Sequence, residues 1–198
     1  MIGQIGPFVK GDQGGRRVLW LHIAGGLVGG CLAGVLLGTT GVALATVVGS
    51  PWQTVSALLL AAMSLVAGLA DLGVIPFAPM RWQKRQTPRG WSCALGPEGS
   101  AFGWAVDLSL GVTTIVSNQA VLVVLAAALL SGGLLSAVLV MVAFGLGRAA
   151  SVAVHAASAG DVNERSNTVD RRFDAYRLIS GLGSLGVALL FLLSEIAR

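Results

Sequence analysis

The chain carries no Lys, Arg, Asp or Glu between Arg17 and Asp71, and again none between Asp107 and Arg148. A hydrocarbon layer about 30 Å thick selects for apolar runs of roughly 20 residues, whereas a soluble fold interrupts such runs with solvated charges. The composition agrees, because 55% of the residues are hydrophobic and only 11% are charged, against about 25% charged residues in soluble domains. The sequence therefore predicts an all-α integral membrane protein with a single transmembrane domain over residues 1–198.

The apolar part of the chain divides into five runs that are candidate membrane spans. They are Val18–Val48, Thr54–Ile75, Ala101–Leu130, Leu134–Val154 and Leu178–Leu193. The third run is ambiguous, since two spans would need a turn at Asn118 and Gln119 and would leave about a dozen residues for the second, too few for a helix to cross. We therefore expect about five transmembrane helices, with the third interrupted near mid-membrane.

Basic residues predict the orientation of these spans. They fall in three clusters between apolar runs: Lys10, Arg16 and Arg17; Arg81, Lys84, Arg85 and Arg89; and Arg165, Arg171 and Arg172. Short loops rich in Lys and Arg stay in the cytoplasm, which assigns residues 1–17, 76–100 and 157–176 to that side of a cell membrane and the C-terminus to the outside. Separated clusters suit the anionic headgroups of a lipid bilayer and lack the continuous basic face of a nucleic-acid-binding protein.

Glycines repeat every four residues in the first run, at Gly26, Gly30, Gly34 and Gly38. At 3.6 residues per turn they form a nearly continuous bare face, which another helix can approach closely. The pattern predicts a helix-packing surface. Its partner is either another helix of this chain or a second copy in a homo-oligomer.

Four ionisable residues lie near the cytoplasmic ends of the expected spans: His22, Asp71, Asp107 and Arg148. Ionisable groups at membrane depth are expensive unless they pair or face water, so we expect Asp107 or Asp71 to lie against Arg148. The cluster is either a structural ion pair or a cytoplasmic gate with a proton-coupling role. No third ligand accompanies the histidines, and no metal site is expected.

The interrupted third run holds the most suggestive chemistry. Hydroxyl and amide side chains concentrate there, at Thr113, Thr114, Ser117, Asn118 and Gln119. A broken helix inside a membrane leaves backbone groups that protein, water or ligand must satisfy, and transporters use such half-helix ends to bind substrates. These five residues are the predicted substrate-binding site. A hydrogen-bonded contact between helices is the alternative.

Two segments, GGRRVLWLHIAGGLVGG and GLGRAASVAVHAASAG, echo each other as a weak internal repeat. This arrangement resembles the CcdA family and the membrane domain of DsbD, along with small exporters of the LysE type. Two further segments look like parts of that family: the fourth helix, in AFGWAVDLSLGVTTIVSNQAVLVVLAAALLSGG, and the start of the fifth, in AFGLGRA. The resemblance implies two three-helix repeats of opposed topology, with the first helix missing here.

The chain departs from that family in its redox chemistry. The family's electron relay needs a cysteine in the first helix and another beside a proline in the fourth, whereas the fourth-helix position here holds Thr114 and Ile115. Thiol-disulfide exchange requires an attacking thiolate and a partner sulfur, and Cys31 has no evident partner, since Cys93 lies in a polar loop. The chain resembles a relative that lacks the relay.

Three functions follow from these observations. The first is a transporter-type protein that moves or handles a small solute or ion at the interrupted helix. The second is a non-catalytic accessory or assembly subunit, in which the glycine face and the Arg81–Trp91 loop bind another membrane protein. The third is a thiol-disulfide electron carrier. No nucleophile triad, phosphate-binding loop or carboxylate pair is present in the sequence, so neither enzymatic activity nor a cofactor is expected.

Overall fold

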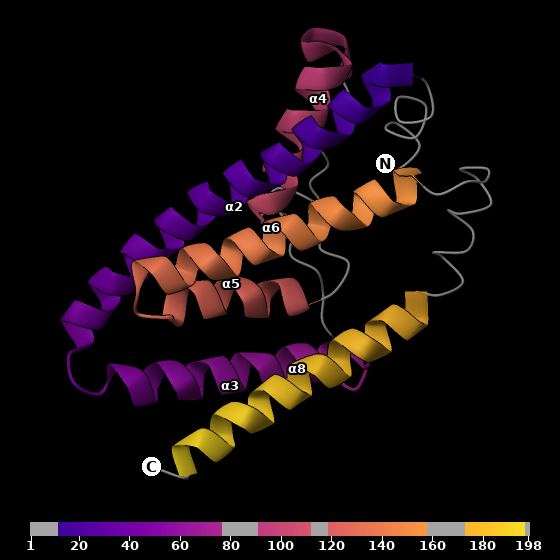
Figure 1. Ribbon diagram of the computed structural model, residues 1–198. Helices are drawn as coiled ribbons and strands as arrows, with labels where there is room; N and C mark the ends of the chain where they lie inside the picture. The colour runs from indigo at the N-terminus through magenta and orange to yellow at the C-terminus, as the bar shows by residue number, and fades with distance from the viewer. Residues whose placement is uncertain (1–11, 77–90, 112–118, 158–172, 197–198) are drawn as a thin grey trace.

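The structure is a computed structural model that describes residues 12–76, 91–111, 119–157 and 173–196. These residues form helices joined by turns, as the all-α prediction requires (Figure 1). The helices are α2 (Asp12–Val48), α3 (Trp52–Asp71), α4 (Trp91–Ser109), α5 (Ala120–Leu130), α6 (Leu134–Ala157) and α8 (Phe173–Ile196). Helix α2 begins and α8 ends at opposite ends of the bundle (Figure 1).

Four of the described helices are long and apolar enough to cross a membrane, which differs from the five expected. They are Gly15–Val48, Trp52–Asp71, Leu134–Val152 and Asp174–Leu193. The run Ala101–Leu130 is instead divided between two helices, because α4 ends at Ser109 and α5 has only 11 residues. At 1.5 Å per residue α5 is about 17 Å long, well short of the hydrocarbon layer.

Helix α4 also begins earlier than the sequence suggests. It starts at Trp91, inside the segment 76–100 that the sequence predicts to be a loop, and it is bent at Gly96, where φ is 64° and ψ is −179°. A positive φ is readily adopted only by glycine, and Pro97 then starts the following turn, where its missing N–H is not needed. The result is a short helical segment before the apolar part of α4.

Helix α2 packs through two glycine faces. A Cβ atom added at Gly30 would lie 2.6 Å from the Met141 carbonyl oxygen of α6, and one added at Gly34 would lie 2.5 Å from the Val138 Cα. Gly26 and Gly38 meet the same helix near Ala149 and Ala137. A second face meets α4, where a Cβ at Gly29 would lie 2.6 Å from the Val106 carbonyl oxygen. The glycine repeat thus packs α2 against α6 of the same chain.

Helix α3 packs antiparallel to α8, also through glycines. A Cβ added at Gly68 would lie 3.0 Å from the Gly181 carbonyl oxygen, and one at Gly181 would lie 3.1 Å from the Gly68 carbonyl oxygen. The bundle therefore contains two closely packed groups, α2 with α4 and α6, and α3 with α8.

Helix α5 lies between these two groups. Its sequence, AVLVVLAAALL, is apolar on every side, which is typical of a helix buried all round. Val123 and Ala126 pack with Leu60 and Ala67 of α3, while Ala128 packs with Ala33 of α2 and with α6. The short helix thus joins both cores.

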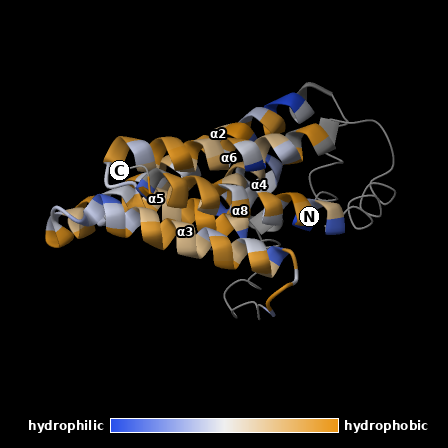
Figure 2. Ribbon diagram, turned by 90° about the horizontal axis from the view of Figure 1, so that it is seen from below, coloured by the Kyte–Doolittle hydropathy of each residue, from blue (hydrophilic) through white to orange (hydrophobic). Residues whose placement is uncertain are grey.

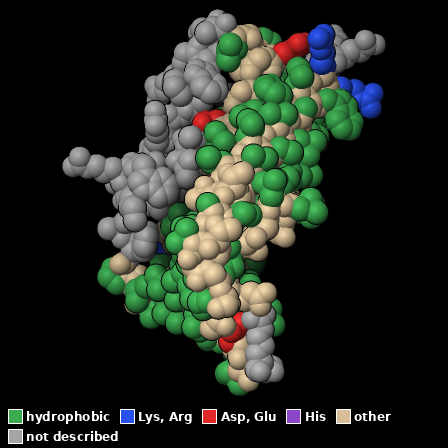
Figure 3. Space-filling model, turned by 90° about the vertical axis from the view of Figure 1, so that its left-hand side faces the viewer, with side chains coloured by type: hydrophobic (Ala, Val, Ile, Leu, Met, Phe, Trp, Pro, Cys, Tyr) green, Lys and Arg blue, Asp and Glu red, His purple; other side chains and the backbone are tan. Residues whose placement is uncertain are grey.

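The outer faces of the long helices expose large apolar side chains. Leu36 on α2, Leu139 on α6 and Leu190 on α8 are 67%, 60% and 69% exposed. Hydrophobic residues run along most of the length of the helices in Figure 2. In the space-filling view of Figure 3, hydrophobic side chains are spread over the face, and the clearly visible Lys and Arg side chains stand at one end. A water-soluble protein rarely exposes so large an apolar surface, so the chain is a helical membrane protein.

Candidate functional site

The C-terminal end of α3 meets the start of α5 and the first turns of α8 in a polar cluster. We call this cluster the Asp71 junction and define it as Asp71, Gln119, Arg177 and Ser180. The backbone N–H of Gln119 donates to Asp71 Oδ1 at 2.8 Å, and the Ser180 hydroxyl donates to Asp71 Oδ2 at 2.7 Å. One carboxylate therefore connects three helices that are far apart in sequence.

The position of Asp71 in the helices explains why it needs these partners. It is the last residue of α3, where a negative charge opposes the partial negative charge of the helix C-terminus. The same carboxylate lies at the N-terminus of α5, where unpaired N–H groups favour an anion. Asp71 is 5% exposed, and its side chain replaces the water that an exposed helix end would bind.

Arg177 adds a cationic donor at the C-terminal end of α3, where the Ala70 carbonyl oxygen also accepts from the Gly73 N–H at 3.0 Å. Its Nη2 donates to the Ala70 carbonyl oxygen at 3.3 Å. Carbonyls in the last turn of a helix have no partner within the helix, and a cation is favourable there. Arg177 and Asp71 thus complement two helix ends that meet inside the protein.

Gln119 is the N-cap residue of α5, and its side chain makes no cap hydrogen bond. Its amide oxygen, Oε1, is buried and has no hydrogen-bond partner among the described residues. Buried amide oxygens are nearly always hydrogen-bonded, so a bound water or ligand is the usual partner of one that the protein itself leaves unsatisfied.

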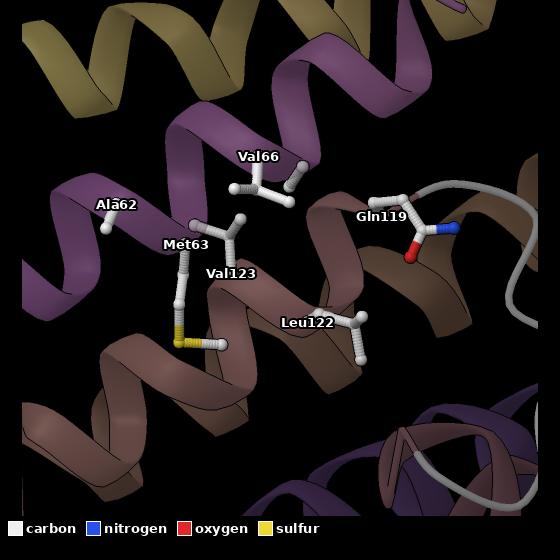
Figure 4. A pocket seen from close by; sticks show the side chains of 7 residues that line it. Ala62, Met63, Val66, Gln119, Leu122 and Val123 are labelled. Carbon is white, nitrogen blue, oxygen red and sulfur yellow. The ribbon is translucent and has the colours of Figure 1, made fainter. Parts of the chain in front are cut away.

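A pocket of about 340 Å³ begins beside Gln119, between α3 and α5 (Figure 4). It is lined by Ala62, Met63, Val66, Ala67, Gln119, Leu122 and Val123. Met63 and Val66 are 42% and 47% exposed, so the rim of the pocket lies on the outer surface of α3, midway along a candidate span. The Asp71 junction therefore stands at one end of an apolar pocket at membrane depth.

Of the five predicted substrate-binding residues, the structure describes Gln119. Thr113, Thr114, Ser117 and Asn118 lie outside the described residues. The structure brings Gln119 together with Asp71, which the sequence assigns to a separate gating cluster. Helix α4 ends at Ser109 before this segment and α5 starts at Ala120 after it.

His22 lies elsewhere, between α2 and α4. Its side chain is fully buried, and Nδ1 lies 3.1 Å from the Ala101 carbonyl oxygen, which assigns the proton to Nδ1. The ring packs against Trp104 with a centroid distance of 5.4 Å. The second ring nitrogen, Nε2, is buried without a hydrogen-bond partner among the described residues.

Arg148 and Asp71 are not brought together, although the sequence predicts an ion pair with Asp71 or Asp107. Arg148 lies on α6, and its Cζ stands 5.5 Å from the centre of the Phe144 ring. In the described ranges no carboxylate lies within ion-pair distance of Arg148. Asp71 instead directs both carboxylate oxygens to α5 and α8. Asp107 lies partly buried on α4.

The described residues contain no cluster of side chains suited to metal binding or to thiol chemistry. No three His, Cys, Asp or Glu side chains in these ranges could hold one metal ion. Cys31 is a free cysteine exposed on the surface of α2, and the side chain of Cys93 lies outside the described residues.

The sequence did not predict that Arg177 and Ser180 belong to the site. Both stand at the start of the last apolar run, three residues apart, and so on one face of a helix. A polar pair at the entrance of a span is a usable signal, but it does not name the helix that the pair contacts. The distance of 109 residues between Ser180 and Asp71 hides that contact from any local pattern.

Comparison with models of known protein families found no match, and no curated protein or solved structure was found to be similar to the chain. The resemblance to the CcdA and DsbD families stays a prediction from the sequence.

Proposed function

We propose that the chain is a multi-pass membrane protein of transporter type, which handles a small solute or ion at the interruption between α4 and α5. The observation that supports this most is the start of α5 inside the bundle, where the Gln119 N–H is bonded to Asp71 while its side-chain Oε1 is buried without a partner among the described residues. Half-helix ends of this kind hold substrates and coupling ions in transporters.

In this proposal the residues have different roles. Gln119 belongs to the substrate site together with Thr113, Thr114, Ser117 and Asn118. Asp71 is a positioning residue, because it fixes the start of α5 relative to α3 and α8. The apolar pocket beside Gln119 adjoins this site between α3 and α5. Asp107, Arg148 and His22 remain candidates for a gate at the end that the basic clusters place in the cytoplasm.

Uptake into liposomes tests the proposal. The protein is reconstituted, and uptake of labelled Na⁺, glycine, lysine and glutamate is compared with that of empty liposomes. We expect uptake of at least one probe, and we expect the double variant Thr114→Ala, Asn118→Ala to abolish it. Gly147→Ala is the matched control, because a Cβ there meets nothing within 4 Å.

The outcomes separate the functions. Uptake that persists in the double variant contradicts the placement of the substrate site. If none of the four probes is taken up, transport of Na⁺ and of these three amino acids is rejected and the accessory-subunit alternative is favoured. Two features of the sequence favour that alternative, the glycine face of α2 and the Arg81–Trp91 loop. The glycine face no longer counts in its favour, because α6 covers it and leaves it closed to a partner.

A further inference from the structure

Arg148 is a charged group inside a span, and neither the Asp71 junction nor the pocket uses it. It lies in the candidate span Leu134–Val152, four residues before the end of that span, or about 6 Å along the helix axis. The side chain is only partly exposed. An arginine remains charged in proteins, so its charge has to be compensated in place.

The described part of the chain does not supply that compensation. No carboxylate there lies within ion-pair distance of Arg148, and its contact with the Phe144 ring at 5.5 Å offers a weak quadrupole instead of a full negative charge. The contact is also made within α6, because Phe144 lies one turn before Arg148 on the same helix. By contrast, Arg17 near the start of α2 has Glu98 Oε1 at 3.3 Å from its Nε.

The location indicates what kind of anion could reach Arg148. Ala149 packs against Gly26 of α2, so this end of α6 lies beside the N-terminal part of α2, where Arg16 and Arg17 stand. Short basic segments mark the cytoplasmic side, whose leaflet is rich in anionic lipids. One helical turn inside the end of an apolar span is the depth at which a long arginine side chain meets lipid headgroups.

We infer that Arg148 binds an oxyanion of the phosphate type at this end of α6. The planar guanidinium forms bidentate hydrogen bonds with phosphate oxygens, which a lysine ammonium does not reproduce. The phosphate belongs either to an anionic lipid headgroup or to a free anion from the cytoplasm. This inference does not depend on the proposed substrate site at the start of α5, and it offers a role for Arg148 other than the gate considered above.

Ligand-dependent stability of the full chain in a neutral detergent tests the inference. Thermal unfolding midpoints are measured with increasing phosphatidylglycerol, with phosphatidylcholine, and with inorganic phosphate against chloride at equal ionic strength. A ligand that binds only the folded state raises the midpoint. We expect the concentration of phosphatidylglycerol or phosphate that gives half of the effect to rise about tenfold or more in Arg148→Gln, because a charged hydrogen-bonded pair is lost.

Arg17→Gln is the matched control, since it removes the same charge from an arginine that already has a carboxylate partner. It should respond like the unmodified chain. A response to phosphatidylglycerol alone assigns the site to a lipid headgroup, and a response to inorganic phosphate assigns it to a free anion. Equal responses of the unmodified chain, Arg148→Gln and Arg17→Gln overturn the inference, as does an equal loss in the two variants.

If Arg148→Gln does not fold, lipid binding by Arg148→Lys tests the inference instead. That variant keeps the charge and loses the bidentate geometry. Native mass spectrometry should then show at least a threefold smaller fraction of molecules carrying one phosphatidylglycerol than in Arg17→Lys. Equal fractions overturn the inference.

Discussion

The contact between α2 and α6 gives the sharpest stability prediction, through the substitution Gly30→Ala. The added Cβ would lie 2.6 Å from the Met141 carbonyl oxygen and 2.9 Å from the Val142 Cα. Both atoms belong to the backbone, so no side chain can turn aside. Since ordinary van der Waals contact begins at 3.4 Å, the two helices must move apart by about 0.8 Å.

The cost of that movement follows from packing. A gap of 0.5–1 Å forfeits roughly a quarter to a half of the dispersion energy of the atoms that face it, and overpacking of a well-packed core typically costs about 1–3 kcal/mol. Replacing glycine by alanine inside a helix also gains up to about 1 kcal/mol of helix propensity. We therefore need a control that makes the same gain without the clash.

Gly147→Ala on α6 is that control, because a Cβ there meets nothing within 4 Å. We expect the free energy of unfolding of Gly30→Ala to lie about 1–3 kcal/mol below that of Gly147→Ala. Far-UV circular dichroism during titration from dodecyl maltoside into sodium dodecyl sulfate measures both values. If the two variants agree within about 0.5 kcal/mol, which is less than the lower end of the overpacking range, the close contact is not the feature that holds α2 to α6.

Three other predictions concern the Asp71 junction, His22 and the membrane topology, and the first two use the same unfolding measurement. Asp71→Asn should lower the free energy of unfolding by about 1.5–3 kcal/mol, because charge-assisted bonds to α5 and α8 are lost. Ser180→Ala removes one of these bonds and should lower it by about 1 kcal/mol. Equal losses in the two variants contradict the central position of the carboxylate. His22→Phe should change the free energy of unfolding by less than about 1 kcal/mol, because the lost bond to Ala101 is offset by removal of Nε2, which is buried without a partner among the described residues. A loss above roughly 2 kcal/mol means that Nε2 has a partner. The topology is tested in a variant without Cys31 and Cys93. There, Ser50→Cys should react with a membrane-impermeant maleimide on intact cells, and Val74→Cys should react only after permeabilisation. The reverse pattern would mean that the orientation in the membrane is opposite to the predicted one.

The sequence predicts the membrane environment well, because a run without charge from Val18 to Ala70 is hardly compatible with a water-soluble fold. It also indicates which face of α2 is bare. It does not indicate that α6 covers that face, since many apolar helices could do so and the choice depends on the whole bundle.

The predicted number of spans is wrong for a physical reason. Hydropathy measures how apolar a run is, and the last part of the third run, Ala120–Leu130, is apolar throughout. It does not register that α5 packs against helices of both groups, which buries Val121, Val123, Ala126 and Ala128 in a helix of 11 residues that is too short to cross the bilayer. The partners of Asp71 escape prediction because they come from segments 48 and 109 residues away.

The order of synthesis gives the Asp71 junction a further meaning. Helix α3 leaves the ribosome long before α8, so the carboxylate of Asp71 enters the bilayer without the Ser180 hydroxyl that later binds it. Helix α5 is too short to be retained as an independent span, and it depends on α3, whose Asp71 binds its N-cap residue, and on the helices that pack around it. The junction is therefore completed only after α8 has been made, and a chain truncated before α8 leaves Asp71 Oδ2 without the Ser180 hydroxyl, which is costly for an ionisable group at membrane depth.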